Sequence, residues 1–240
     1  MESLINAATS ESLDEAYRPI NGADGKSDPA WRLKRIGINH DLLIGSNQDE
    51  WRMYFNDENQ TREDYLRSLP KSVQKLLKPI GNDLTERRER LDAVYSLVNF
   101  HCPAVLLAEA THAPHRAYVY RFAQVRAHAD ALGSYHGAEI PYVFNTHDGW
   151  LPTSEADRQL TEQMMAAWAA FMWKGDPNAR LWFQGAASKP PVPWPQYQRS
   201  NPKWIRWNTP ISYAEDAAQV PLCRELAPML YDSTVDYGAR

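Results

Sequence analysis

The spacing of hydrophobic residues along this chain changes several times between the pattern of a strand and that of a helix. Residues 41–45 form a short apolar run that ends at Gly45, which is typical of a buried strand. Residues 117–123 alternate and are rich in aromatic side chains, and residues 204–208 have a similar composition. The pattern therefore predicts three strands, fewer than a complete doubly wound sheet usually has.

Helical periodicity fills much of the sequence between these predicted strands. Residues 61–98 show it, with breaks at Pro70, Pro79 and Gly81. Residues 103–112 predict a further short helix. Because predicted strands alternate with predicted helices, the pattern favours the α/β class.

The clearest helix is predicted over residues 155–173. Thr153 or Ser154 can cap its first turn, and Gly175 is suited to end it. One face carries a stripe of large apolar side chains: Leu160, Met164, Trp168 and Phe171. Such a stripe is typical of a helix that packs on a core, and we do not interpret it as a cofactor site.

Two further segments lack the hydrophobic spacing of a strand or helix that packs on a core. Residues 1–30 are polar and rich in turn signals, which indicates a lead-in to the domain. Residues 190–195, Pro-Pro-Val-Pro-Trp-Pro, predict a stiff extended segment that crosses the domain surface. A ligand for a proline-binding domain is the alternative interpretation of that segment.

Composition narrows the classes of partner. The formal net charge of -4 lacks the basic footprint of proteins that bind nucleic acid or anionic membranes, so we expect neither partner. No run of 18 apolar residues predicts a transmembrane helix, and the first residues lack the regions of a signal peptide. Localisation is therefore not determined.

The cysteines and clustered histidines give weak signals. Cys102 and Cys223 are too few for a disulfide framework or a zinc site of their own. Two buried thiols are the favoured interpretation, and a single disulfide is the alternative. His112 and His115 flank Pro114, which favours an exposed loop over a metal site, so no metal is expected.

A candidate pair for acid–base chemistry follows two of the predicted strands. Glu50 lies in the loop after residues 41–45, and His136 lies in a loop after residues 117–123. Ligands of open α/β sheets bind beyond the carboxyl ends of the strands. A carboxylate beside an imidazole fixes its tautomer and stabilises the imidazolium. Spacing alone is weak support, because 7 histidines and 30 acidic residues offer many such pairs.

The segments around this pair carry a resemblance to a known family. Residues 42–50, Leu-Leu-Ile-Gly-Ser-Asn-Gln-Asp-Glu, and residues 133–144, Gly-Ser-Tyr-His-Gly-Ala-Glu-Ile-Pro-Tyr-Val-Phe, resemble the acid and histidine segments of type-B carboxylesterases, which include cholinesterases. Residues 168–178 and 194–197 are similar to later segments in the family's order, and residues 17–25 resemble its lead-in more loosely. The resemblance implies the C-terminal part of an α/β-hydrolase fold, with an incomplete central sheet flanked by helices.

The same resemblance implies roles for individual residues. Glu50 would orient His136, and His136 would act as the general base and acid of an acyl-transfer triad. Asp49 is the alternative acid, and Glu139 is expected to be structural. Trp51 stands where the family typically has glycine. The implied reaction is hydrolysis of a carboxylic ester through an acyl-serine, with no metal or cofactor.

The nucleophile of such a triad is missing from the sequence. Its serine belongs to a Gly-x-Ser-x-Gly elbow, and this chain contains none. Ser27 in Gly-Lys-Ser-Asp-Pro lacks the second glycine and precedes Glu50 too closely. Ser134 stands one place early in its segment, and Ser46 follows a strand without an elbow. A His-Gly-Gly oxyanion loop is also absent.

We therefore expect residues 1–240 to form a single incomplete carboxylesterase-like domain. It would consist of the lead-in, a matched region over residues 31–210, and a tail over residues 211–240. Such a chain would be inactive alone and would act on a small ester only with another chain that carries the nucleophile half. The alternatives are a non-catalytic binding module of the same fold and a truncated, non-functional gene product.

Overall fold

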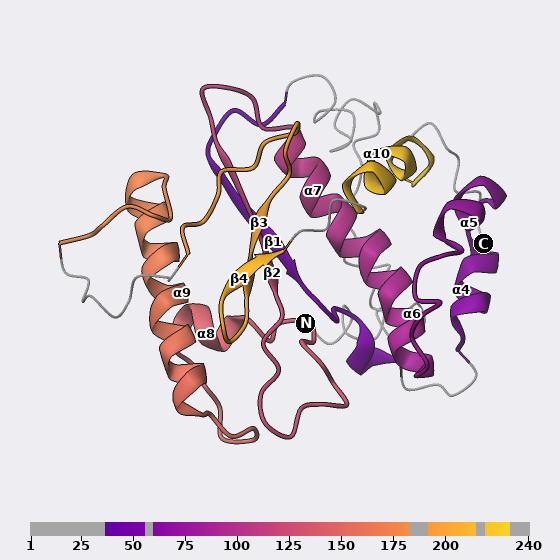
Figure 1. The fold of residues 1–240 in the computed structure, drawn as a ribbon, viewed down its shortest axis with the longest axis horizontal. Coiled ribbons are helices and arrows are strands. Elements are labelled where there is room, and N and C mark those ends of the chain that lie inside the picture. The colour runs from indigo at the N-terminus through magenta and orange to yellow at the C-terminus, as the bar shows by residue number, and fades with distance from the viewer. Residues whose placement is uncertain (1–36, 56–59, 183–191, 215–218, 231–240) are drawn as a thin grey trace, which may run out of the picture.

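The computed structural model describes residues 37–55, 60–182, 192–214 and 219–230. A four-stranded sheet lies at its centre, and helices flank it (Figure 1). The strands, in their order across the sheet, are β1 (Leu42–Asn47), β2 (Ala117–Phe122), β3 (Trp204–Trp207) and β4 (Ser212–Ala214). The first three are parallel, and β4 runs antiparallel to β3. The predicted α/β class and three predicted strands are confirmed.

The fourth strand was not predicted from the sequence. β4 consists of only Ser212, Tyr213 and Ala214, which is too short to show an alternating pattern. It pairs with β3 across the turn that follows that strand. The lead-in over residues 1–30, with Ser27, lies outside the described residues.

Each face of the sheet has its own core. Tyr118 and Phe122 of β2 pack against α8 (Ile140–Phe144) and α9 (Glu155–Lys174). Ala117 and Val119 point to the other face, because successive strand residues alternate, and pack with α7 (Cys102–Glu109) and α10 (Gln219–Leu230). In Figure 1, α8 and α9 lie on one side of the strands, and α7 and α10 on the other.

The ends of α9 follow the sequence closely. The Ser154 hydroxyl accepts a hydrogen bond from the backbone N–H of Asp157, while the Asp157 carboxylate accepts one from that of Ser154. This reciprocal arrangement satisfies two of the N–H groups at the helix start. Gly175 ends the helix with φ of 64°, a left-handed conformation that favours glycine. Ser154, and not Thr153, is therefore the cap.

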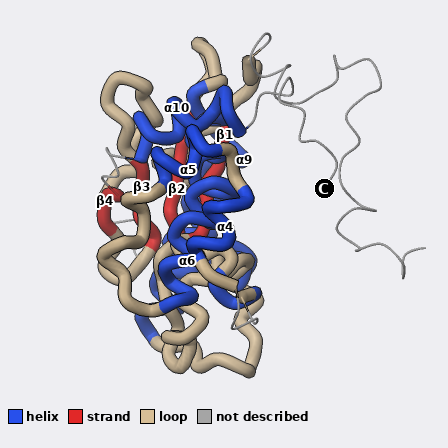
Figure 2. Tube along the Cα trace, turned by 90° about the vertical axis from the view of Figure 1, so that its right-hand side faces the viewer, coloured by secondary structure: helices blue, strands red, loops and turns tan. Residues whose placement is uncertain are grey.

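A further layer of helices lies outside α7 and α10 and packs on them in a separate core. It contains α4 (Arg62–Ser68), α5 (Lys71–Leu77) and α6 (Arg87–Ser96), which lie in front of the strands in Figure 2. The predicted breaks at Pro70, Pro79 and Gly81 all fall between these helices. α6 continues through a π-helical segment, η2 (Leu97–His101), directly into α7. That continuity was not predicted, because the helical pattern and Pro103 indicated two separate helices.

This continuous helix, Arg87–Glu109, bears on the question of membrane spans. By length and composition it could cross a membrane, although no uninterrupted apolar run marked it in the sequence. In the structure, 61% of its most apolar window is buried inside the molecule, as in the core helix of a folded domain. It is the one such helix among the residues that the structure describes.

The two cysteines form a disulfide that joins α7 to α10. Cys102 and Cys223 are both fully buried, and their Cα atoms lie 5.0 Å apart. The favoured interpretation of two buried thiols is therefore wrong, and the alternative is correct. A separation of 121 residues in sequence gave no sign that the fold brings them together.

The prediction that residues 190–195 cross the surface is wrong for Trp194. Its side chain is only 2% exposed, and its indole N–H donates a hydrogen bond to the Val119 carbonyl at 2.8 Å. Four aromatic rings surround it: Tyr118, Tyr120, Trp168 and Trp207. The prolines around Trp194 indicated a surface segment, so its position in the core was not predicted. The prolines at 190 and 191 lie outside the described residues.

We expect Trp194→Ala to lower the free energy of unfolding by about 3–5 kcal/mol, because it leaves a large cavity in the core between the sheet and α9. Trp150→Ala is the matched control, since Trp150 is 57% exposed, and should cost less than about 1 kcal/mol. Urea unfolding followed by circular dichroism measures both. Equal losses at the two positions would contradict the placement of Trp194 in the core.

Candidate active site

The candidate site forms where β1 and β2 end side by side. The parallel register pairs Asn47, the last residue of β1, with Phe122, the last residue of β2. The N–H of Gln48 donates to the Phe122 carbonyl at 2.8 Å, so the pairing continues one residue into the next segment. We call residues 48–51 the acid loop and residues 132–139 the histidine loop. Both lie at the carboxyl edge of the sheet, where the sequence predicted a ligand site.

The structure brings Glu50 and His136 into direct contact. Oε2 of Glu50 lies 2.6 Å from Nδ1 of His136, and Oε1 of Glu50 accepts a hydrogen bond from the Asn47 N–H at 2.7 Å. The Glu50 side chain is 5% exposed, whereas that of His136 is 49% exposed. Within the described ranges, Nε2 of His136 has no hydrogen-bond partner. The carboxylate is therefore held from two sides, and the imidazole keeps one nitrogen free for another group.

A second set of contacts ties the two loops together. The Asp49 N–H donates to the Ser134 carbonyl at 3.1 Å, and the Ser134 N–H donates to the Asp49 carboxylate at 2.8 Å. Gly133 has φ of +63°, and a Cβ atom at this position would lie 2.4 Å from Oδ2 of Asp49. The close approach of the loops therefore requires glycine here. Glu50, and not the alternative acid Asp49, is the carboxylate that contacts the imidazole.

Burial makes both acid-loop carboxylates harder to ionise. Desolvation raises the pKa of Glu50, and the hydrogen bonds from His136 and Asn47 oppose this effect. Desolvation also raises the pKa of Asp49, and the hydrogen bond from the Ser134 N–H opposes it. The charged form of each carboxylate therefore depends on the hydrogen bonds that join the loops.

Trp51 is accommodated by a buried carboxyl group beneath the acid loop. Its N–H donates to Oδ1 of Asp92 at 2.8 Å, and the Ser96 hydroxyl donates to the same oxygen at 2.7 Å. Asp92 is 2% exposed, and burial raises its pKa to about 7 against the effect of these hydrogen bonds. Asp92 was not predicted as a site residue, although a lone acid between the apolar residues Leu91 and Val94 of α6 was a signal.

Three aromatic rings lie close to the imidazole ring of His136. The ring centroids of three residues lie within 6.5 Å of that of His136: Phe100 at 5.4 Å, Trp51 at 6.0 Å and Tyr54 at 6.5 Å. Trp51 also stacks on Tyr95, with centroids 5.3 Å apart. Trp51 therefore packs between the histidine and α6, in contact with rings on both sides.

The two serines nearest to the site in sequence are engaged elsewhere. The Ser134 hydroxyl donates to the Phe122 carbonyl at 3.0 Å, and the Ser46 hydroxyl accepts from Arg121. Glu139 accepts a hydrogen bond from the Asn47 side chain at 2.6 Å. In the part of the chain that the structure describes, no group of three or more His, Cys, Asp or Glu residues is arranged to hold a metal.

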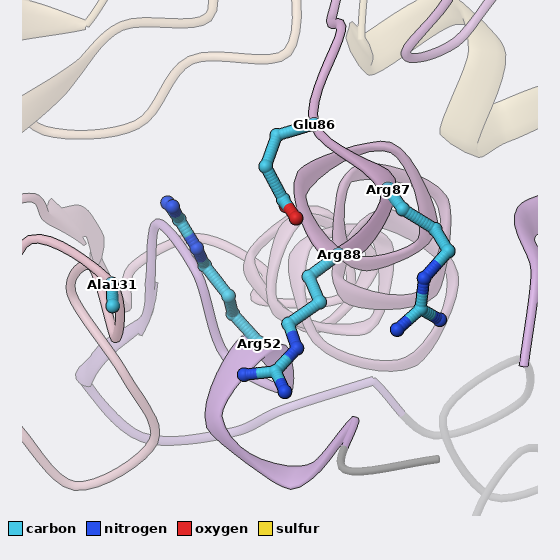
Figure 3. A pocket seen from close by; sticks show the side chains of 5 residues that line it. All are labelled: Arg52, Glu86, Arg87, Arg88 and Ala131. Carbon is cyan, nitrogen blue, oxygen red and sulfur yellow. The ribbon is translucent and has the colours of Figure 1, made fainter. Parts of the chain in front are cut away.

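A cavity adjoins the acid loop without including the Glu50–His136 pair. Its lining consists of Arg52, Glu86, Arg87, Arg88 and Ala131. Arg52 belongs to the short helix η1 (Arg52–Tyr54) and forms a 2.7 Å ion pair with Glu89. Figure 3 shows that the guanidinium groups of Arg52 and Arg88 end in different parts of the cavity. They do not converge on one point.

Comparison with known proteins finds a matching family model, curated relatives and solved structures of similar fold. The model of the carboxylesterase family matches residues 24–222. The chain is 24% identical over 185 residues to a para-nitrobenzyl esterase of Bacillus subtilis, a match that covers 73% of this chain and 35% of that protein. It is 26% identical over 163 residues to an acetylcholinesterase of Bungarus fasciatus, with 62% and 25% covered.

One more curated relative and one solved structure also match the chain. Human neuroligin-2 is 26% identical over 200 residues, with 68% of this chain and 24% of that protein covered. A solved PNB esterase structure has a TM-score of 0.59 at 22% identity and shares the fold over 76% of this chain and 38% of its own. The chain therefore spans about a third or less of the length of the curated relatives that it matches.

We expect Asp92→Asn to stabilise the protein, and to do so more at pH 8 than at pH 5. The native pKa of Asp92 is about 7, against an ordinary value of 3.8, so between these values the native state binds the proton and the unfolded state does not. This residue therefore lowers the stability of the wild type as the pH rises from about 4 to about 7, by a few kcal/mol in total. Asparagine keeps the acceptor for Trp51 and Ser96 without the titration.

Urea midpoints of the wild type and of Asp92→Asn, measured from about pH 4.5 to 8.5, test this expectation. The difference between the two proteins isolates Asp92, because all other titrating groups are shared. A difference that stays constant across this pH range would contradict the assignment.

Proposed function

Because the chain belongs to the carboxylesterase family, we propose that Glu50 and His136 are the acid and the general base of a carboxylic-ester hydrolase whose attacking serine lies outside these 240 residues. The contact of 2.6 Å between Oε2 of Glu50 and Nδ1 of His136 carries this proposal. The substrate class is a small carboxylic ester. Two of the relatives are named as esterases, which supports this class.

The geometry suits proton transfer through the free imidazole nitrogen. With Nδ1–H donating to Glu50, Nε2 of His136 carries the lone pair that accepts the proton of a serine hydroxyl. The serine oxygen attacks the ester carbonyl, and the imidazolium then protonates the departing alcohol. Water completes the cycle by the same route, releasing the carboxylic acid and restoring the serine. Glu50 stabilises the imidazolium in both halves of the cycle.

The position of the nucleophile is part of the proposal. The sequence contains no Gly-x-Ser-x-Gly elbow, and the hydroxyl groups of Ser46 and Ser134 are engaged with other groups. We propose that a polypeptide carrying the nucleophile and the oxyanion donors completes the site. Those donors typically contribute about 3–4 kcal/mol to the transition state, so we expect the chain alone to be inactive.

A chimera tests the roles of the pair. Residues 24–230 of this chain, which keep α10 and the Cys102–Cys223 disulfide, would replace the corresponding segment of the Bacillus subtilis para-nitrobenzyl esterase, which supplies its own nucleophile half. We expect p-nitrophenyl acetate hydrolysis that falls by at least about 100-fold in His136→Ala, because proton transfer is lost. Glu50→Gln should lower kcat more than it changes KM, because it acts through the imidazole. His112→Ala is the matched control, since this histidine is exposed.

The isolated chain tests the position of the nucleophile. We expect its p-nitrophenyl acetate hydrolysis to equal that of its own His136→Ala variant, and a fluorophosphonate probe to leave its serines unlabelled. Turnover by the isolated chain that depends on His136 would contradict the placement of the serine outside it. A folded, active chimera that is indifferent to His136 would contradict the proposed base.

A further inference from the structure

We propose that Asn47 is a positioning residue, which sets the geometry of the Glu50–His136 pair by joining the two loops that carry them. The catalytic use of this geometry rests on the proposed function, whereas the contacts of Asn47 do not. Asn47 is the last residue of β1 and is 1% exposed. It is thus placed where the sheet ends and the acid loop begins.

Asn47 donates hydrogen bonds to both loops. Its backbone N–H donates to Oε1 of Glu50 at 2.7 Å, which fixes the carboxylate on the side away from the imidazole. Its side-chain Nδ2 donates to the carbonyl of Tyr135 at 2.7 Å and to Oε2 of Glu139 at 2.6 Å. Tyr135 directly precedes His136, so one residue holds the carboxylate and the backbone that carries the imidazole.

A third element holds the backbone of Asn47 itself. Nε2 of His101, in η2, lies 3.0 Å from the Asn47 carbonyl. A carbonyl oxygen only accepts, so Nε2 of His101 carries the proton. Burial lowers the pKa of His101 well below its usual value, which keeps the ring neutral. The contacts of Asn47 therefore join β1, the acid loop, the histidine loop and η2.

The partners of the side chain explain why an amide is needed. Both partners of Nδ2 are acceptors, which fixes the orientation of the amide. Aspartate would replace the donor with a carboxylate oxygen that faces the Tyr135 carbonyl and the Glu139 carboxylate, and like groups repel. Alanine would leave the Tyr135 carbonyl without this donor. Either change removes the link from β1 to the backbone next to His136 and leaves the Ala138 N–H, at 2.9 Å, as the donor to the Tyr135 carbonyl.

Proton NMR of the chain itself tests this role without any activity measurement. The Nδ1–H proton of His136, assigned by its absence in His136→Ala, should give a downfield signal in the wild type because it is held by Glu50. We expect that signal to be lost in Asn47→Asp. Asn47→Ala should lose it as well and removes the same donor without adding charge, which covers failure of the Asp variant to fold.

Two matched variants separate positioning from general stability. Asn178 also joins two segments, through hydrogen bonds with the backbone of Trp194 at 2.7 and 2.9 Å, so Asn178→Asp should lower stability and keep the signal. Combining Asn47→Asp with Glu139→Gln reverses the hydrogen bond between positions 47 and 139, because the new amide at position 139 can donate to the new carboxylate at position 47. We expect the double variant to regain the signal in part.

Three results of these NMR measurements would overturn the positioning role of Asn47. A signal that persists in folded Asn47→Ala, or one that is lost equally in Asn178→Asp, overturns the positioning role. A wild-type chain without the signal overturns it as well. Failure of the chimera to hydrolyse esters, with the signal still dependent on Asn47, would remove the proposed function and leave this inference standing.

Discussion

The parallel pairing of β1 with β2 is the constraint on which the rest of the structure depends. Because Asn47 pairs with Phe122, the two strands end level, and the loops that follow them meet. A slip of one residue would turn every side chain of β1 to the opposite face. It would also move Glu50 away from the histidine loop. The register of β1 and β2 therefore determines where the two loops meet, and the side chains of the candidate site depend on that placement.

Three buried acidic groups at this edge of the sheet depend on hydrogen bonds for their charged form. Glu50, Asp49 and Asp92 are acidic groups whose pKa values burial raises, and each accepts at least one hydrogen bond from a backbone N–H. A network of this kind is costly when half satisfied and rigid when satisfied. Rigidity is what a general base needs, since its proton transfer depends on a fixed geometry. The buried part of the network holds Glu50, while the half-exposed His136 keeps Nε2 available.

The sequence predicted those parts of the fold that depend on local patterns. An apolar run predicted β1, aromatic-rich segments predicted β2 and β3, and Ser154 and Gly175 marked the ends of α9. The contact between Glu50 and His136 followed from the idea that strand ends share an edge, and the family resemblance selected this pair among many. What local patterns could not show was pairing over long distances in the chain.

Features that depend on distant partners were accordingly missed. β4 exists through its pairing with β3, and the disulfide exists because α7 and α10 pack together. Trp194 is buried by rings from β2, β3 and α9, which the prolines around it concealed. Asn47 is an ordinary polar residue in sequence, and only the returning histidine loop gives its amide two acceptors.

The tautomer of His136 tests the central claim most directly. Nitrogen-15 NMR of histidine-labelled protein, at a pH where the ring is neutral, distinguishes a proton on Nδ1 from one on Nε2. A hydrogen bond from Nδ1 to Glu50 requires the proton on Nδ1, with Nε2 unprotonated. Finding the proton on Nε2 would contradict the account, because the nitrogen that should accept a proton would already hold one.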